Sequence, residues 1–321
     1  MAVVGAGRMG RGIAHSFAYG GYDVTLIDLK ARSEQETAQA REDAQAELAR
    51  TIGLMQTFGL IDAAQQERIL ARISYVARAQ AEAALGQAGV VFEGVPEKVE
   101  LKEEALKFIG DHVRDECLIA STTSTIDVNT LAGFSKLPER FLNAHWLNPA
   151  FLIPLVEVSP GEITTEQSTR RLEEILESVG KVPVVCAASP GYIVPRIQAL
   201  AMNEAARLVE EGVASAEDVD KAIRVGFGVR YAVLGLVEFI DWGGGDILYY
   251  ASRYLTGALG NERYASPEVV TRKMEAGDIG VKTGKGFYDF TDVDVEAYQR
   301  ETLQKFVDLL KHLKLLPPPA G

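Results

Sequence analysis

The chain of 321 residues has few cysteines, few histidines and no long apolar run. Its two cysteines, Cys117 and Cys186, are too few to staple a fold of this size and offer no metal-ligand spacing. This usage is typical of a reducing compartment and predicts no bound metal. No apolar run approaches the roughly 18 residues of a membrane span. The first residues, MAVVGAGRMG, lack the pattern of a secretory signal, so we expect a cytoplasmic protein.

Basic residues are also scarce relative to acids, with 33 Lys and Arg against 45 Asp and Glu and a net charge of −12. A charge of this sign repels nucleic acid and anionic membrane surfaces, although a local basic pocket can still hold an anionic ligand. Apolar residues make up 47% and charged ones 24%, which is ordinary for a globular protein and excludes disorder. A small-molecule partner is therefore expected.

Short apolar runs alternate with helical patterns through the first 190 residues. Continuous apolar strands separated by helices predict a mostly parallel sheet covered on both faces, the α/β class. Between the second and third runs, residues 33–73 predict a helical hairpin with a break at Gly59. The expected strands are residues 2–4, 23–28, 89–93, 118–121, 141–146, 154–158 and 181–186.

A glycine motif follows the first expected strand and opens the helical run 11–19. In a GxGxxG motif the first glycine allows a tight turn, the second lets the backbone approach a pyrophosphate, and the third permits close helix–strand packing. The helix N-terminus then offers free N–H groups and its dipole to the phosphates. We expect the cofactor to lie against the residues of this motif, Gly5, Gly7, Arg8, Met9 and Gly10.

Asp28 ends the second expected strand, 18 residues after Gly10, close to the usual spacing of about 20. A carboxylate at this point accepts the ribose hydroxyls and repels a 2′-phosphate, which predicts NAD rather than NADP. Strand, glycine motif, helix and acid together predict a Rossmann-type domain over residues 1–188. Composition changes near 187–191, and only helical patterns follow, so we expect an all-helical second domain over residues 189–321.

Only one of the four histidines, His145, ends an expected buried strand. The chain then turns at two prolines, Pro149 and Pro154, and enters an apolar strand that carries Glu157, so the two strands are expected side by side. A buried carboxylate is costly unless it is paired. A His–Glu pair at this sheet edge can take the proton of a hydroxyl group while hydride leaves the same carbon. A purely structural hydrogen-bonded pair is the alternative. The other histidines are expected in or beside helices: His15, His112 and His312.

A series of short motifs runs along nearly the whole chain. In order, they are Gly5-x-Gly7-x-x-Gly10, Val95-Pro96-Glu97, Ser121-Thr-Thr-Ser124, His145-x-x-Asn148-Pro149, Leu155-Val-Glu157, Gly191-Tyr-Ile-Val-x-Arg196, Asn203-Glu204-Ala205 and Thr283-Gly-Lys-Gly-Phe-Tyr288. This series resembles the L-3-hydroxyacyl-CoA dehydrogenase family over about residues 1–290. The resemblance implies a Rossmann domain followed by a helical dimerisation domain, and hence a homodimer.

The same resemblance implies roles for individual residues. The family's catalytic His and Glu fall on His145 and Glu157, its active-site Ser on Ser124, and its substrate-binding Asn on Asn203. From the residues alone, Ser124 is a hydroxyl in a Ser/Thr loop and Asn203 is a polar residue on a helix.

Further positions of this sequence match family positions that line the cofactor pocket. They are Glu97, Lys102, Ser124 and Asn148. For Glu97 and Lys102 the alternative is that they are ordinary loop charges.

Departures from the CoA-using members indicate the substrate. Pro154 and Pro195 stand where those members usually carry Lys and Asn, and between residues 51 and 73 only Arg68 and Arg72 could hold CoA phosphates. The segments 152–157 and 226–232 are similar to the branch that acts on free hydroxy acids, which includes L-gulonate 3-dehydrogenase (lambda-crystallin) and carnitine dehydrogenase.

Arg230 lies in a glycine-bounded apolar stretch, where an uncompensated guanidinium is costly. A substrate carboxylate could satisfy it through two parallel hydrogen bonds, and pairing with Glu238 or Asp241 is the alternative. The sequence thus predicts NAD-dependent oxidation of the 3-hydroxyl of a small free 3-hydroxycarboxylic acid. One alternative is the same chemistry on an L-3-hydroxyacyl-CoA such as 3-hydroxybutyryl-CoA. Another is a crystallin-like structural NAD-binding protein, which would need neither His145 nor Glu157.

Overall fold

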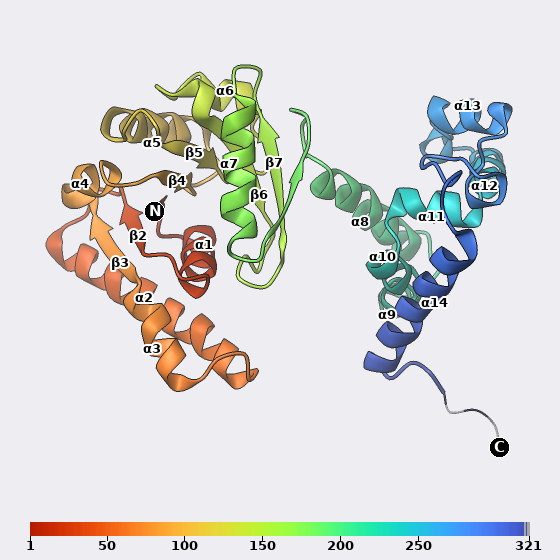
Figure 1. Cartoon of the computed structure of the whole chain (residues 1–321), viewed down its shortest axis with the longest axis horizontal. Helices are drawn as coiled ribbons and strands as arrows, with labels where there is room; N and C mark the ends of the chain where they lie inside the picture. The colour runs from red at the N-terminus through yellow and green to blue at the C-terminus, as the bar shows by residue number, and fades with distance from the viewer. Residues whose placement is uncertain (318, 320–321) are drawn as a thin grey trace. The chain divides into compact units, whose positions relative to one another are not determined.

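The computed structural model describes residues 1–317 and 319 and divides into two compact units, Met1–Ala201 and Met202–Gly321. The first unit, red to green in Figure 1, is built on an eight-stranded sheet in the order β3-β2-β1-β4-β5-β6-β7-β8. β6 and β7 pair antiparallel, and the other neighbouring pairs are parallel. The strands are β1 (Ala2–Val4), β2 (Val24–Asp28), β3 (Ile73–Ala77), β4 (Val90–Glu93), β5 (Leu118–Ser121), β6 (Phe141–Trp146), β7 (Leu155–Pro160) and β8 (Val182–Val185).

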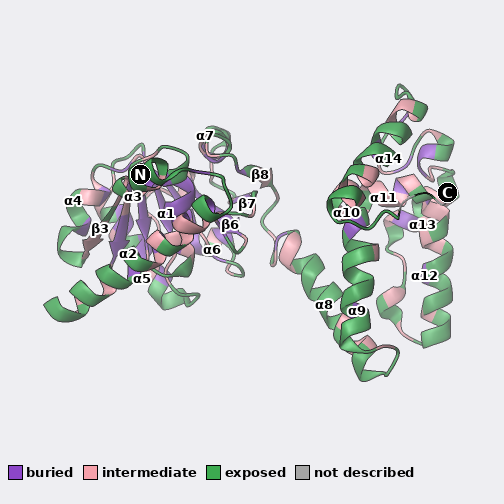
Figure 2. Cartoon of the chain, turned by 90° about the horizontal axis from the view of Figure 1, so that it is seen from below, coloured by how far each residue is buried: buried purple, intermediate pink, exposed green. Residues whose placement is uncertain are grey.

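Helices cover both faces of this sheet, and Figure 2 shows the strands as its buried layer. Helices α1, α2, α3 and α7 pack on one face and α4, α5 and α6 on the other. Side chains of β1 alternate between the two faces of the sheet: Val3 belongs to the apolar cluster on one face, and Ala2 and Val4 belong to the cluster on the other. The helices of this unit are α1 (Arg8–Tyr19), α2 (Glu34–Thr57), α3 (Ala63–Ala71), α4 (Ala81–Leu85), α5 (Val99–His112), α6 (Val128–Ala132) and α7 (Glu166–Glu177). The predicted mostly parallel sheet of Rossmann type is confirmed.

The hairpin between β2 and β3 begins and turns at recognisable signals. Ser33 and Glu36 form a reciprocal capping box at the start of α2, and Gly59 adopts a φ of +72° between the two helices. Asp62 and Gln65 form a second capping box at the start of α3.

Strand β3 was not among the expected strands, because the helical pattern was extended to Ile73. In the structure α3 ends at Ala71, and residues 73–77 pair in parallel with β2 at the edge of the sheet. Ile73 and Tyr75 are only half-buried and Ser74 is exposed, so the segment lacks the continuous apolar run of a central strand.

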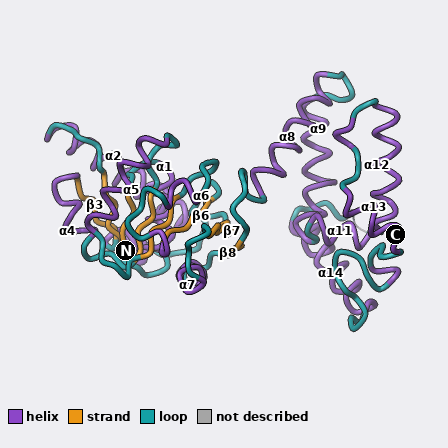
Figure 3. Tube along the Cα trace, turned by 90° about the horizontal axis from the view of Figure 1, so that it is seen from above, coloured by secondary structure: helices purple, strands orange, loops and turns teal. Residues whose placement is uncertain are grey.

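The second unit is helical, as predicted, and Figure 3 shows its helices linked by loops. After β8, the described residues contain isolated bridges at Gly280, Lys285 and Asp289 but no further strand. A buried carboxylate organises part of this unit, since Asp241 accepts the backbone N–H of Phe287 at 3.0 Å and of Tyr288 at 2.7 Å. The helices are α8 (Val194–Glu210), which contains the boundary between the units, α9 (Ala216–Ala222), α10 (Val229–Val233), α11 (Leu236–Gly243), α12 (Gly245–Leu259), α13 (Glu268–Ala276) and α14 (Val295–His312). None of the described helices combines the length and apolar character that a membrane crossing requires.

Candidate active site

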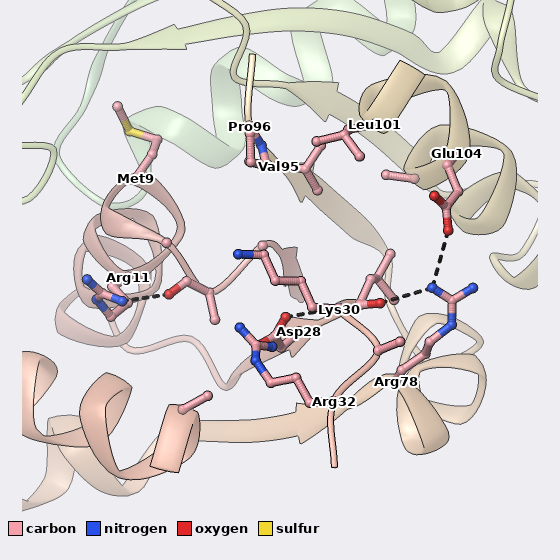
Figure 4. Close-up of a pocket in the computed structure, with 18 of the residues that line it drawn as sticks. Met9, Arg11, Asp28, Lys30, Arg32, Arg78, Val95, Pro96, Leu101 and Glu104 are labelled. Atoms are coloured by element: carbon pink, nitrogen blue, oxygen red, sulfur yellow. Dashed lines mark hydrogen bonds and ion pairs between the residues drawn. The ribbon is translucent and has the colours of Figure 1, made fainter. Parts of the chain in front are cut away.

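A cavity of about 690 Å³ lies beyond the carboxyl ends of β1, β2 and β4 (Figure 4). The strand order reverses between β1 and β4, and this switch point is where open α/β sheets bind dinucleotides. Its charged lining is mostly basic in a chain that is acidic overall, which suits an anionic ligand. The basic lining residues are Arg8, Arg11, Lys30, Arg32 and Arg78, and the acidic ones are Asp28, Asp43 and Glu104.

Glycine is needed at the three motif positions for different geometric reasons. A side chain on Gly5, whose φ is +107°, would lie 2.6 Å from the Gly94 carbonyl oxygen, and one on Gly10 would lie 1.9 Å from the Gly5 oxygen. At Gly7, in contrast, nothing lies within 4 Å of the position of a Cβ. Gly7 is the N-cap of α1 and has no side chain to occupy the first amides of the helix, so these face open space. This cradle fits the pyrophosphate of a dinucleotide.

Asp28 lies at the cavity as predicted, but its carboxylate already has several donors. Tyr75 donates its hydroxyl at 2.9 Å. Lys30 donates its backbone N–H at 3.1 Å, and Arg32 forms an ion pair with the same carboxylate (Figure 4). Burial, together with the Asp28 charge, raises the pKa of Tyr75 to about 12, so the phenol stays a donor. Asp28 is therefore held in place as an acceptor at the end of β2.

His145 and Glu157 face each other directly across the antiparallel pair β6–β7. His145 Nδ1 lies 2.8 Å from Glu157 Oε2, and the two side chains are almost fully buried, at 6% and 1% exposed. The expected pair is therefore present. Because β5 and β6 are parallel, His145 lies toward the same carboxyl edge of the sheet as the end of β5.

The buried carboxylate of Glu157 is satisfied on both oxygens. Oε2 faces His145, and Oε1 accepts the backbone N–H of Ile193 at 2.9 Å and of Val194 at 2.8 Å. These two amides stand at the start of α8, where N–H groups have no partner within the helix. The start of the helix thus supplies two backbone donors to this carboxylate.

Ser124 follows β5 in an exposed loop, and Glu97 fixes that loop. Glu97 Oε1 accepts the backbone N–H groups of Ser124 and Thr125, each at 3.0 Å, and the hydroxyls of Thr123 and Thr125. Burial opposes ionisation of Glu97, but the Thr123 hydroxyl, the Lys102 cation and the Thr125 donors outweigh it and hold the pKa of Glu97 below its usual value. Glu97 is outside the set of residues that line the cavity.

Lys102 differs from the expectation that it lines the cofactor pocket. Its side chain is fully buried, and Nζ lies 3.0 Å from both oxygens of Glu93 and 3.6 Å from Glu97 Oε2. The reason is that β4 ends in a buried carboxylate, which requires a buried cation. Lys102 therefore acts as the buried ion-pair partner of Glu93 and Glu97 and does not line the cavity.

His145, Glu157 and Ser124 are not among the residues that line the cavity, and neither are the remaining predicted residues. Gly10 is buried behind the glycine turn, and Asn148 is exposed in the turn after β6, next to a cis peptide bond to Pro149. Asn203 and Arg230 are exposed in the second unit, on α8 and α10.

Two residues near His145 were not singled out by sequence reasoning. Tyr192 stacks on the His145 ring. The sequence feature that could have identified it is a bulky residue directly after Gly191 in a turn. Lys181 is buried beside Trp146, and its signal was a cation at the start of an apolar strand.

Comparison with known proteins identifies the family. A model of the 3-hydroxyacyl-CoA dehydrogenase NAD-binding domain matches residues 1–189, and a model of the C-terminal domain of the same enzymes matches residues 191–290. The chain belongs to the 3-hydroxyacyl-CoA dehydrogenase family. Members of this family depend on NAD, and the glycine cradle and Asp28 described above fit that cofactor.

Individual relatives of this family match over different lengths. 5-Formyl-3-hydroxy-2-methylpyridine 4-carboxylate 5-dehydrogenase of Mesorhizobium japonicum is 30% identical over 98% of both chains. A probable 3-hydroxybutyryl-CoA dehydrogenase of Deinococcus radiodurans is 32% identical over 90% of this chain and 99% of its own. Among solved structures, a 3-hydroxyacyl-CoA dehydrogenase of Archaeoglobus fulgidus gives a TM-score of 0.76 with 32% identity, over 98% of this chain and 99% of the other.

Proposed function

We propose that this protein oxidises the secondary hydroxyl group of a small free 3-hydroxycarboxylic acid to the 3-oxo acid, with NAD as acceptor. The observation that carries the proposal is the buried contact of His145 Nδ1 with Glu157 Oε2 at 2.8 Å. Hydroxyl oxidation needs a base with a fixed tautomer, and this pair supplies one.

The chain's own residues move the proton. Because Glu157 is an acceptor, the hydrogen of the neutral imidazole is on Nδ1, and the free lone pair is on Nε2. His145 Nε2 takes the hydroxyl proton as hydride leaves the same carbon, and Glu157 stabilises the imidazolium that forms. When bound, NAD supplies the hydride acceptor. In the reverse direction His145 returns the proton to the oxygen.

The further contacts of cofactor and substrate that we propose are those implied by the resemblance to the family. We propose that the reacting oxygen of the substrate accepts hydrogen bonds from the Ser124 hydroxyl and from the side-chain amide of Asn203. The Glu97 carboxylate, through the Ser124 backbone, keeps that loop in position. The proposed contacts of the cofactor are Gly5, Gly7, Arg8, Met9, Asp28, Ser124 and Asn148.

Arg230 supports a free carboxylate as the substrate's charged group. The acids that could have paired with it are engaged elsewhere, Asp241 by backbone amides and Glu238 by the Tyr298 hydroxyl at 2.8 Å. Among residues 1–317 and 319, no carboxylate lies within ion-pair distance of Arg230, whose guanidinium instead lies over the Phe239 ring at 5.6 Å. The Mesorhizobium relative, which matches 98% of this chain, is named for a pyridine carboxylate.

The second candidate is the same oxidation of a 3-hydroxyacyl-CoA. It is favoured by the relatives named 3-hydroxybutyryl-CoA dehydrogenase, which match 90% of this chain. NADH absorbance with 3-hydroxybutyrate, gulonate and carnitine, set against 3-hydroxybutyryl-CoA, separates the two. Turnover of a free acid supports the first proposal, and turnover of the thioester alone replaces it with the second. No turnover, with NAD still bound, would leave a structural NAD-binding protein.

Two variants test the residue assignments. His145→Gln should lower kcat by roughly 10²- to 10⁴-fold with NADH binding retained, whereas His112→Gln, at the end of α5, serves as control. Arg230→Met should raise the KM for the free acid by about 10- to 100-fold, the value of a charge-assisted hydrogen-bond pair. Arg224→Met is its matched control, because Arg224 is an exposed arginine in the π-helical segment Ile223–Gly228 that directly precedes α10. Wild-type turnover in His145→Gln removes the proposed base.

We further propose a homodimer formed through the second unit. Support comes from large apolar side chains exposed on α8 and α12, which mark interaction surfaces when they cluster. Those in the second unit include Met202, Tyr250 and Tyr254. Sedimentation equilibrium measures the mass directly, and a monomer at micromolar concentration would contradict the proposal.

A further inference from the structure

Tyr192 forms one wall of the space around His145. The two rings are stacked, with centroids 5.1 Å apart and planes inclined by 13°. Tyr192 is 7% exposed, so this contact is shielded from solvent. The imidazole is thus fixed in two ways, by the Glu157 carboxylate at Nδ1 and by an aromatic face against its plane.

The Tyr192 hydroxyl connects this ring to the loop that follows β5 and to strand β6. It donates to the carbonyl oxygen of Thr123 at 3.0 Å and accepts from the side-chain amide of Asn143 at 3.0 Å. Burial raises the pKa of Tyr192, so the hydroxyl remains protonated and keeps its donor role. Thr123 directly precedes Ser124, and Asn143 precedes His145 by two residues on β6. The phenol therefore connects the Ser124 loop with the strand that carries the base.

The backbone at this point is strained. Tyr192 has a φ of +43°, in the left-handed region that residues with a side chain seldom adopt, directly after Gly191 at +77°. Such a conformation is unfavourable for the backbone and persists where the surroundings require it. The same turn aims the N–H groups of Ile193 and Val194 at Glu157. One strained turn thus supplies both the stacked ring and the donors that hold the carboxylate.

We propose that Tyr192 is a positioning residue of the reaction, which holds the imidazole plane of His145 in its productive orientation through ring stacking. The inference rests on the proposed role of His145 as base. A ring face in contact with the imidazole also favours its protonated form, which arises during oxidation. The hydroxyl bonds, in this view, hold the phenol ring in place.

Three variants separate ring, hydroxyl and backbone. Tyr192→Phe keeps the ring and removes both hydroxyl bonds, and Tyr192→Leu removes the ring. Tyr192→Asn removes the ring as well but suits the left-handed backbone, because Asn tolerates that region. Tyr22→Leu is the control. Tyr22 lies just before β2, and this substitution also removes an aromatic contact, with Phe17 at a centroid distance of 5.5 Å, and a hydroxyl hydrogen bond with Ser178.

We expect Tyr192→Leu and Tyr192→Asn to lower kcat by about 10- to 100-fold, the cost of a misplaced base, with the KM for NAD unchanged. The acidic limb of the kcat profile should move to lower pH in both, because the protonated ring loses its aromatic neighbour. Tyr192→Phe should keep that limb in place and restore most of kcat. Melting temperatures report folding, and if Tyr192→Leu is unfolded, the Asn and Phe variants decide.

Wild-type kcat and pH profile in Tyr192→Asn would overturn the inference, as would an equal loss in Tyr22→Leu. The proposed function fails separately, through His145→Gln. If that variant loses turnover while the Tyr192 variants do not, the base stands and the positioning role does not.

Discussion

The ammonium nitrogen of Lys181 lies 5.4 Å from the ring centroid of Trp146, the residue that directly follows the proposed base. The same nitrogen donates hydrogen bonds to the carbonyl oxygens of Ala150 at 2.6 Å and Ile153 at 2.9 Å. Ala150 also accepts from the Ser16 hydroxyl at 3.1 Å. The turn between β6 and β7 is thus anchored to helix α1, which begins at the glycine motif.

This buried cation predicts a pH dependence of stability. Burial lowers the pKa of Lys181 from 10.5 to about 8. Between these values the unfolded chain binds a proton that the folded chain does not, so the free energy of unfolding should rise with pH from 8 to 10. Lys181→Met should lack this increment. Urea denaturation at pH 7.5 and 9.5 measures it, with Lys107→Met, an exposed lysine on α5, as control. An equal change in the free energy of unfolding between pH 7.5 and 9.5 for the wild type and Lys181→Met would contradict the assignment.

His15 predicts a second dependence, at acidic pH. The His15 ring stacks on Phe151 at 4.7 Å, and burial, with the Lys181 charge, lowers its pKa to about 4. The unfolded chain therefore takes up a proton between about pH 6.5 and 4, and stability falls as pH falls through that range. From pH 7 to 5 the loss should be on the order of 2 kcal/mol. His15→Phe keeps the aromatic stacking and should not show this loss of stability between pH 7 and 5, whereas His112→Gln should still show it. Thermal denaturation at both pH values distinguishes them.

Replacing glycine by alanine should have different effects at two positions of the glycine motif, Gly7 and Gly10. Gly7→Ala meets no atom within 4 Å, so its melting temperature should equal that of the wild type, while NADH affinity falls about tenfold as the new methyl group displaces the pyrophosphate. Gly10→Ala forces a carbon to 1.9 Å from the Gly5 oxygen and should destabilise the fold by roughly 1–3 kcal/mol or more. Calorimetry and NADH fluorescence separate the two effects. A destabilised Gly7→Ala with normal affinity would show that the cradle does not hold phosphate.

Glu97 predicts a loss in catalysis through the Ser124 loop. Glu97→Gln replaces a charged acceptor of several donors by a neutral amide, so kcat/KM should fall by about tenfold, the value of a charge-assisted hydrogen bond. Because the pKa of Glu97 is lowered in the fold, its contribution to stability is present above its ordinary value of 4.5 and is lost as pH falls below it. Steady-state kinetics and acid denaturation of both proteins check these points. An unchanged kcat/KM would remove Glu97 from the support of Ser124.

Much of the fold could be predicted because the central strands are continuous apolar runs between turn residues. Residues 118–121 and 141–146 form strands with the expected bounds, since β5 and β6 are buried on both faces. Residues 73–77 could not be predicted in this way, because an edge strand needs apolar side chains on part of its surface only.

The site was predictable where local sequence determines geometry. Two prolines between His145 and Glu157 indicated adjacent strands, and the structure places the pair in register. The burial of Lys102 depends on the Glu93 carboxylate at the end of a different element, and the role of Tyr192 depends on a left-handed backbone. Neither relationship leaves a periodic pattern in the sequence.

The cross-strand register of His145 and Glu157 also limits how the chain between them can change in length. Side chains alternate between the faces of a strand, so inserting or deleting a single residue within β6 or β7 would turn the carboxylate to the opposite side of the sheet. Homologues that keep this dyad should therefore confine changes of length to the connection 147–154, or carry a bulge that restores the phase within the strand.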